Sequence, residues 1–206
     1  MKKFYLTTAI DYVNNLPHLG TAYEKIGAGV LAHFLKMEGR EVHLQMGNDE
    51  HSEGVKKAAE EKKLEPKVYC DQMRKKFEAI WKDLGIGYDD FVQTSEKRHV
   101  LAVETLIRAI KKTDIYKEKY EGWYCDACEA FYTEKDLMNG ECPNHKKKPQ
   151  WLSEENYFFR LSHYQDDLLK LYAEHPEFIL PVIRRNEVLN FVKGGLQDIS
   201  ISRSSF

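Results

Sequence analysis

Three cysteines and one histidine have the types and spacing of metal ligands. Cys125 and Cys128 are separated by two residues, and Cys142 and His145 repeat this spacing after an intervening stretch of 13 residues. Two close pairs joined by a loop are typical of tetrahedral zinc sites with three thiolates and one imidazole. Four protein ligands leave no position for a water molecule, so we expect structural Zn2+ that stabilises the local fold.

The turn at residues 17–21 (PHLGT) has the residue types of a phosphate-binding site. A helix predicted to start here offers free backbone N–H groups and the positive end of its dipole to an anion. Gly20 permits close approach of the backbone, and His18 can donate a hydrogen bond to a phosphate oxygen. Ligands of open α/β folds bind at the carboxyl ends of the strands, where this turn is expected. An ordinary turn is the alternative.

The hydrophobic pattern of residues 1–112 predicts the scaffold for that turn. Apolar residues recur at helical spacing from Gly20 to Gly39, and apolar and polar residues then alternate as in a strand. The expected elements are strands at residues 4–8, 42–46 and 91–92, and helices from Gly20 to Gly39 and at residues 52–64, 66–83 and 95–112. This order favours an α/β fold with a doubly wound parallel sheet.

An insertion is expected to begin near residue 113, where short aromatic and polar stretches replace the earlier pattern. We place it at residues 113–195, with the zinc knuckle at about residues 120–150 and helices at residues 161–173 and 184–193. Residues 196–206 are expected to return to the first domain as a strand.

Composition limits the partners that the chain can have. It has 31 Lys and Arg against 33 Asp and Glu, so the net charge of −2 gives no overall field to attract a polyanion. No apolar run approaches the roughly 20 residues needed to cross a bilayer. We expect a cytoplasmic protein with no membrane contact, in which the spaced cysteines bind metal and Cys70 is a buried helical thiol.

Seven blocks of the sequence, in order and covering nearly the whole chain, resemble the methionyl-tRNA synthetase family. They are residues 7–14 (TTAIDYVN), 17–20 (PHLG), 47–51 (GNDEH), 123–125 (WYC), 155–161 (ENYFFRL), 185–191 (RNEVLNF) and 198–203 (DISISR). The resemblance implies the first half of a Rossmann-like catalytic domain, with the zinc knuckle in the connective insertion between its halves.

The resemblance also implies an ATP site at the turn, where the family usually has His-Ile-Gly-His. ATP, with its Mg2+, would contact Pro17, His18, Leu19, Gly20 and Thr21. His18 and Thr21 would have the catalytic roles. Thr21 departs from the usual histidine, and its hydroxyl can still form a hydrogen bond to phosphate.

The methionine site implied by the resemblance has an apolar part and a charged part. Ala9, Ile10 and Tyr12 would line the pocket for the thioether side chain, because apolar and aromatic surfaces suit such a group. Asp49 would pair with the substrate's ammonium group, and Arg203 would pair with Asp49.

Three positions near these sites carry a second interpretation or a departure from the family. Asp49 could instead cap the following helix. Asp11 stands where many relatives have Pro or Tyr, and Ser52 stands where many have Gly.

Two further groups have an ordinary interpretation beside a functional one. The lysines at residues 146–148 could contact tRNA phosphates, although a solvated loop is favoured. The aromatic residues at 157–159 could stack on bases, although a place in the core is favoured.

The implied activity is methionine–tRNA ligation: ATP-dependent activation of L-methionine to methionyl adenylate, followed by transfer to tRNA(Met). The family's Lys-Met-Ser-Lys-Ser loop and anticodon-binding domain do not occur in the 206 residues. We therefore expect the chain to be inactive alone and to need the C-terminal half of the synthetase as its main protein partner. The alternatives are a non-catalytic paralogue and a zinc-knuckle RNA-binding module.

Overall fold

The computed structural model describes residues 3–125 and 130–202, which form two compact units divided between Thr105 and Leu106. The division lies within helix α4 (Lys97–Ala109), a few residues before the boundary expected at residue 112. Among the described residues, no helix is both long enough and apolar enough to cross a membrane.

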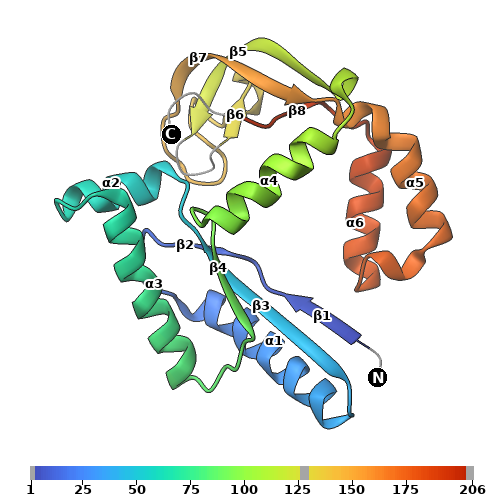
Figure 1. The fold of residues 1–206 in the computed structure, drawn as a ribbon. Coiled ribbons are helices and arrows are strands. Elements are labelled where there is room, and N and C mark those ends of the chain that lie inside the picture. Colours follow the sequence, from blue (N-terminus) through green and yellow to red (C-terminus); the bar gives the residue numbers. More distant parts are fainter. Residues whose placement is uncertain (1–2, 126–129, 203–206) are drawn as a thin grey trace. The chain divides into compact units, whose positions relative to one another are not determined.

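The first unit is built on a parallel sheet with β3 (Glu41–Asp49) at its centre. Strands β1 (Lys3–Thr7) and β2 (Asp11–Tyr12) pair one after the other with the same edge of β3. Strand β4 (Asp90–Gln93) pairs with the other edge, and every pairing is parallel. Figure 1 shows these strands side by side. The predicted parallel sheet is therefore confirmed.

Helices connect the parallel strands because the chain must return to the opposite end of the sheet before the next strand starts. Helix α1 (Leu19–Met37) links β2 to β3, and α2 (Glu53–Glu61) and α3 (Pro66–Asp83) link β3 to β4. Pro66 occupies the first turn of α3, where its missing N–H costs no hydrogen bond.

The core of the first unit lies on one face of the sheet. Successive strand residues point to opposite faces, so the alternate residues Val42, Leu44 and Met46 are buried on the same side. They belong to one apolar cluster with residues of α1 and α3: Ala32, Leu35, Phe77 and Trp81. On the other face, Tyr5 stacks on His43 with ring centroids 5.6 Å apart, and both residues are exposed.

Helix α1 differs from the expected amphipathic helix in the side that it buries. The side of α1 that carries Ala32 and Leu35 lies against the core. The larger apolar residues, whose spacing predicted the helix, are exposed instead. Tyr23 is 82% exposed and Val30 is 65% exposed. The exposed stripe of α1 consists of Leu19, Tyr23, Ile26, Val30, Phe34 and Met37.

The second unit contains an antiparallel sheet with strand order β6-β5-β7-β8. Strands β5 (Ile115–Cys125) and β7 (Gln150–Phe159) form a long ribbon, with β6 (Ala130–Tyr132) beside β5. Helices α5 (Gln165–Glu174) and α6 (Val182–Lys193) pack against each other. Short 3-10 helices occur at Lys112–Asp114, Glu134–Asp136, Leu161–Tyr164 and Pro176–Phe178.

Strand β8 (Ile199–Ser200) has a different partner from the one that the sequence suggested. We expected residues 196–206 to return to the parallel sheet, but within the described residues β8 pairs with β7 of the antiparallel sheet. The aromatic residues at 157–159 differ in burial. Phe158 is buried as expected, whereas Tyr157 is exposed because alternate residues of β7 face solvent.

Phe77 provides a test of this core. Its side chain is 1% exposed and packs edge-on against Trp81. Phe77→Ala should lower the free energy of unfolding by about 3–5 kcal/mol, the usual cost of removing a buried phenyl group. Chemical denaturation followed by tryptophan fluorescence measures this. Phe34→Ala is the matched control in the same unit: Phe34 is 54% exposed, so a comparable loss there would contradict the assignment of the core.

Candidate functional site

The candidate site residues gather at the carboxyl ends of the parallel strands. Residues 8–12 follow β1 along this edge, β3 ends at Asp49, and α1 starts at Leu19. All three belong to the first unit. Because the strands are parallel, their carboxyl ends share one edge of the sheet, which is the usual ligand-binding edge of open α/β folds.

His18 caps the N-terminus of α1 with its side chain. Its Nδ1 accepts a hydrogen bond from the backbone N–H of Gly20 at 3.0 Å. An Nδ1 that accepts carries no proton, so the proton of the neutral imidazole is on Nε2. The exposed ring can therefore donate from Nε2 to an anion at the start of the helix.

Thr21 completes the cap and fixes the backbone of His18. The backbone N–H of His18 donates to Oγ1 of Thr21 at 3.0 Å, and that hydroxyl donates to the carbonyl oxygen of His18 at 2.8 Å. The threonine in place of the family's second histidine thus has a structural role. Leu19 is exposed beside it, and Pro17 is half-buried.

Gly20 leaves the space that the imidazole needs. A Cβ atom at this position would lie 2.8 Å from Cε1 and 3.0 Å from Nδ1 of His18, closer than real Cβ contacts. Any side chain at residue 20 would therefore displace the imidazole from its capping position.

Ile10, Tyr12 and Asp49 share the face of the sheet opposite to α1. Tyr12 pairs with Asp49 in the parallel register, and paired residues point to the same face. Gly47 lies on this face too, where an added Cβ would be 2.5 Å from Cγ1 of Val92 and 3.2 Å from Cγ2 of Ile10. An apolar surface and a carboxylate are thus combined at the end of β3, with both Ile10 and Tyr12 partly exposed.

Asp49 does not cap the following helix. Ser52 does so: its Oγ accepts from the backbone N–H of Val55 at 3.1 Å, and its side chain is buried. Asp49 accepts one hydrogen bond from the backbone N–H of His51 at 3.0 Å. Its carboxylate retains further acceptor capacity for a cationic ligand. Arg203, its expected partner, lies outside the described residues.

Lys25 holds residues 9–11 against helix α1. Its fully buried ammonium donates to the carbonyl oxygen of Ala9 at 2.8 Å, to Asp11 at 3.2 Å and to Glu24 at 2.9 Å. Oε1 of Glu24 accepts from the backbone N–H of Ala9 at 2.7 Å. Sequence reasoning missed Lys25, although its spacing to Ala28, Ala32 and Leu35 places it on the buried side of α1.

The two carboxylates around Lys25 respond differently to their surroundings. Burial raises the pKa of Asp11 above its usual range, and its contacts with Lys25 only partly offset this effect. Burial also acts to raise the pKa of Glu24, but the hydrogen bonds from Ala9 and Lys25 outweigh it and lower that pKa.

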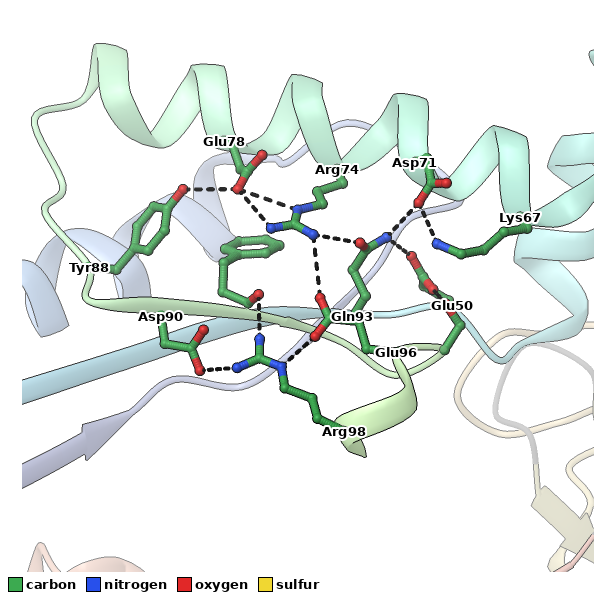
Figure 2. A network of polar contacts seen from close by, with 12 residues as sticks. Glu50, Lys67, Asp71, Arg74, Glu78, Tyr88, Asp90, Gln93, Glu96 and Arg98 are labelled. Atoms are coloured by element: carbon green, nitrogen blue, oxygen red, sulfur yellow. Dashed lines mark hydrogen bonds and ion pairs between the residues drawn. The ribbon is translucent and has the colours of Figure 1, made fainter. Parts of the chain in front are cut away.

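A polar network fixes the chain directly after Asp49 (Figure 2). The backbone N–H of Glu50 donates to Oγ1 of Thr94 at 2.9 Å, and the buried Glu50 carboxylate accepts from Gln93 and Ser95. Arg74 donates to Gln93 at 2.7 Å, so α3 is joined to the same group. The end of β3 therefore has little freedom to move.

Cys70 lies beside this network and is buried in α3, as expected. Burial raises the pKa of its thiol to about 12, which favours the protonated form at neutral pH.

Three of the four expected metal ligands converge in the second unit. One ligand atom from each of Cys125, Cys142 and His145 lies within 4.8 Å of the others. Ligands at 2.3 Å from a tetrahedral zinc ion are about 3.8 Å apart, so this arrangement needs only a small contraction to bind the ion. The two thiols are buried, and His145 is exposed. Cys128 lies outside the described residues.

Backbone turns place Cys142 and His145 close to Cys125. The backbone N–H of Cys142 donates to the carbonyl oxygen of Lys147 at 2.9 Å. The backbone N–H of Lys146 donates to the carbonyl oxygen of Cys142 at 2.8 Å. Asn139 and Gly140 both have positive φ in the turn before Cys142, as a tight hairpin turn requires. The lysines at residues 146–148 are exposed.

Comparisons with known proteins give one consistent result. The family model described as tRNA synthetases class I (M) matches residues 4–150 and 135–205. The methionine–tRNA ligase of Thermotoga maritima is 44% identical over 99% of this chain and 33% of its own length. That of Synechocystis is 47% identical over 97% of this chain and 38% of its own length.

A solved structure agrees with these sequence relatives. The methionyl-tRNA synthetase of Mycobacterium tuberculosis in complex with methionyl-adenylate is 39% identical to the chain, with a TM-score of 0.94. The similarity covers 100% of this chain and 42% of that protein. The chain thus spans about a third of the length of the curated relatives that it matches.

The metal site can be tested by removing one ligand. Cys142→Ser should abolish stoichiometric zinc binding and lower the thermal stability of the second unit, because metal binding and local folding are coupled. Zinc content after dialysis and the thiolate absorbance of the cobalt-substituted protein measure the loss of metal binding. Cys70→Ala, which removes a thiol in α3, should leave both values unchanged. Retention of full zinc content by Cys142→Ser would contradict the site.

Proposed function

The chain belongs to the class I tRNA synthetases (M), and from this premise we propose that it is the substrate-activating part of a methionine–tRNA ligase. One observation carries the proposal. A helix N-terminus suited to phosphate and an apolar face with a carboxylate lie at the same edge of one sheet. A nucleotide and an amino acid that react with each other need such neighbouring sites.

The proposed reaction joins the substrates without a covalent intermediate on the enzyme. A carboxylate oxygen of L-methionine attacks the α-phosphorus of ATP, which is bound as its Mg2+ complex. The bond from that phosphorus to the β-phosphate bridging oxygen breaks, giving methionyl adenylate and pyrophosphate. A terminal hydroxyl of tRNA(Met) then takes the methionyl group, and AMP leaves.

The ATP site in this proposal is the capped start of α1. Nε2 of His18 donates to a phosphate oxygen at the positive end of the α1 dipole and stabilises the charge that develops during attack. Thr21 holds His18 through two hydrogen bonds. Pro17 and Leu19 flank the nucleotide, and Gly20 allows the close approach.

The methionine site is assigned to the opposite face of the sheet. Ile10 and Tyr12, with Ala9 beside them, supply the surface for the thioether. Asp49 pairs with the ammonium group, supported by its position at the rigid end of β3. We assign Arg203 as the partner of Asp49 from the resemblance to the family.

The connective insertion is assigned to residues 113–195, which have their own antiparallel sheet. Zn2+ bound by Cys125, Cys128, Cys142 and His145 would cross-link the end of the ribbon, which is a structural role. The four ligands would leave no open coordination position, so the zinc ion would take no part in the chemistry.

The main protein partner in this proposal is the remaining part of the synthetase. Two surfaces support it: the exposed stripe of α1, and the sheet face that carries Tyr5 and His43. Relatives about three times as long supply further chain that can cover such surfaces. We place the complete enzyme in the cytoplasm, where tRNA is charged.

Methionine-dependent exchange between ATP and pyrophosphate tests the proposed function. We expect little exchange with the chain alone and clear exchange after addition of the remaining part of a related synthetase. The rate with methionine should exceed the rates with leucine and norleucine at least tenfold, because the sulfur and the unbranched chain are both recognised. Equal rates with all three amino acids, or zinc-dependent RNA binding without any exchange, would overturn the proposal.

The role of His18 predicts the effect of a substitution at Gly20. Gly20→Ala should lower the exchange rate about 10- to 100-fold, because the methyl group displaces the donor to phosphate. Stability should change little, because alanine favours a helix over glycine by up to about 1 kcal/mol and this offsets the loss of the His18 cap, which costs about 1 kcal/mol. Gly27→Ala in the same helix is the control, because its Cβ meets nothing within 4 Å. Equal exchange rates for both variants would contradict the assigned role.

A further inference from the structure

Lys25 is the one lysine among the described residues whose side chain is fully buried, and all its hydrogen-bonding capacity is used. An ammonium group has three N–H donors. Three acceptors meet it: the carbonyl oxygen of Ala9, the carboxylate of Asp11 and the carboxylate of Glu24. Nζ is also 3.0 Å from the second carboxylate oxygen of Asp11, whose side chain is 12% exposed.

Two of the three acceptors of Lys25 lie in one short segment, residues 9–11, and the third, Glu24, holds the same segment. Ala9 is held at both backbone groups, its carbonyl by Lys25 and its N–H by Glu24. Asp11 is held by its side chain and by pairing with Asn48 of β3. Asp11 points towards α1, so its neighbours Ile10 and Tyr12 point to the opposite face, where the amino-acid site was assigned.

The same helix that carries Lys25 carries the nucleotide site. His18 lies seven residues, or about 10 Å along the helix axis, before Lys25. Helix α1 therefore has the phosphate-binding turn at its start and the anchor of residues 9–11 two turns later. A shift of that segment relative to α1 would alter the distance between the two substrates.

A buried ion pair is a costly way to stabilise a fold, since apolar residues of similar volume usually do this as well or better. An ion pair with three directed hydrogen bonds does specify position. We infer that Lys25 is a positioning residue, which fixes the segment of residues 9–12 on α1 so that the amino acid is held in line with the nucleotide. The inference rests on the proposed function.

The test compares the wild-type chain with two variants. Lys25→Met keeps the length of the side chain and removes its charge, which leaves Asp11 without its cation. The double variant Asp11→Asn, Lys25→Met removes both buried charges, and the carboxylate of Glu24, whose side chain is 43% exposed, remains solvated, so no buried unpaired charge is left to unfold the chain. Lys36→Met is the control, because Lys36 lies on the same helix and its ion pair with Asp89 is away from residues 9–12.

The first measurement is hydrogen exchange on the 206-residue chain, which does not depend on activity. In the double variant, exchange of residues 8–13 should accelerate at least tenfold, because the carbonyl of Ala9 loses its donor and Glu24, the acceptor of the Ala9 amide, loses the ion pair that orients it. Residues 41–49 of β3 should keep wild-type exchange. Unchanged exchange of residues 8–13 would overturn the inference whatever the activity.

The second measurement is pyrophosphate exchange with the remaining part of the synthetase added. The KM for methionine should rise about tenfold in the double variant, and the KM for ATP should stay within about twofold, because the phosphate site on α1 is intact. Unchanged kcat and unchanged KM for methionine in the double variant would indicate a purely structural role and would overturn the inference. Absence of methionine-dependent exchange in the wild type would instead overturn the proposed function, and the assigned role of Lys25 with it.

Discussion

Parallel pairing on both edges of β3 is the constraint on which the rest of the first unit depends. A parallel neighbour requires the chain to cross back along the sheet, so α1 must start at the carboxyl ends of the strands. Residues 9–12 and the end of β3 are brought to that same edge. The topology alone therefore places the N-terminus of α1 beside the carboxyl end of β3, whatever side chains these positions carry.

Three residues that depart from the family pattern each have a local partner. Thr21 exchanges two hydrogen bonds with the backbone of His18. Ser52 caps α2, and Asp11 pairs with Lys25. All three stabilise the backbone next to a candidate substrate contact. The substitutions therefore alter how the site is supported and leave the exposed His18 and the half-buried Asp49 in place.

Periodicity and turn residues predicted the strands and helices of the first unit closely, because those signals are local. The partners of individual residues could not be predicted in this way. Spacing along α1 places Lys25 on the buried side of the helix, but it does not reveal the acceptors of Lys25, which are up to 16 residues away. Strand β8 shows the same limit: alternation marks a strand, but pairing with β7 is decided by the fold of the second unit. The exposed stripe of α1 has the apolar spacing of a core-facing side, because such spacing does not indicate which part of the chain covers it.

The ribbon of β5 and β7 has a mechanical consequence. Its strands stay paired from Ile115 and Phe159 at the base to Tyr124 and Gln150 near the cysteine cluster. At 3.4 Å per residue this is a lever arm of about 30 Å. A rotation of 10° at the base would carry the far end through about 5 Å, on the same lever length. The length of the paired ribbon therefore turns a small change of angle at its base into a large displacement at the cysteine cluster.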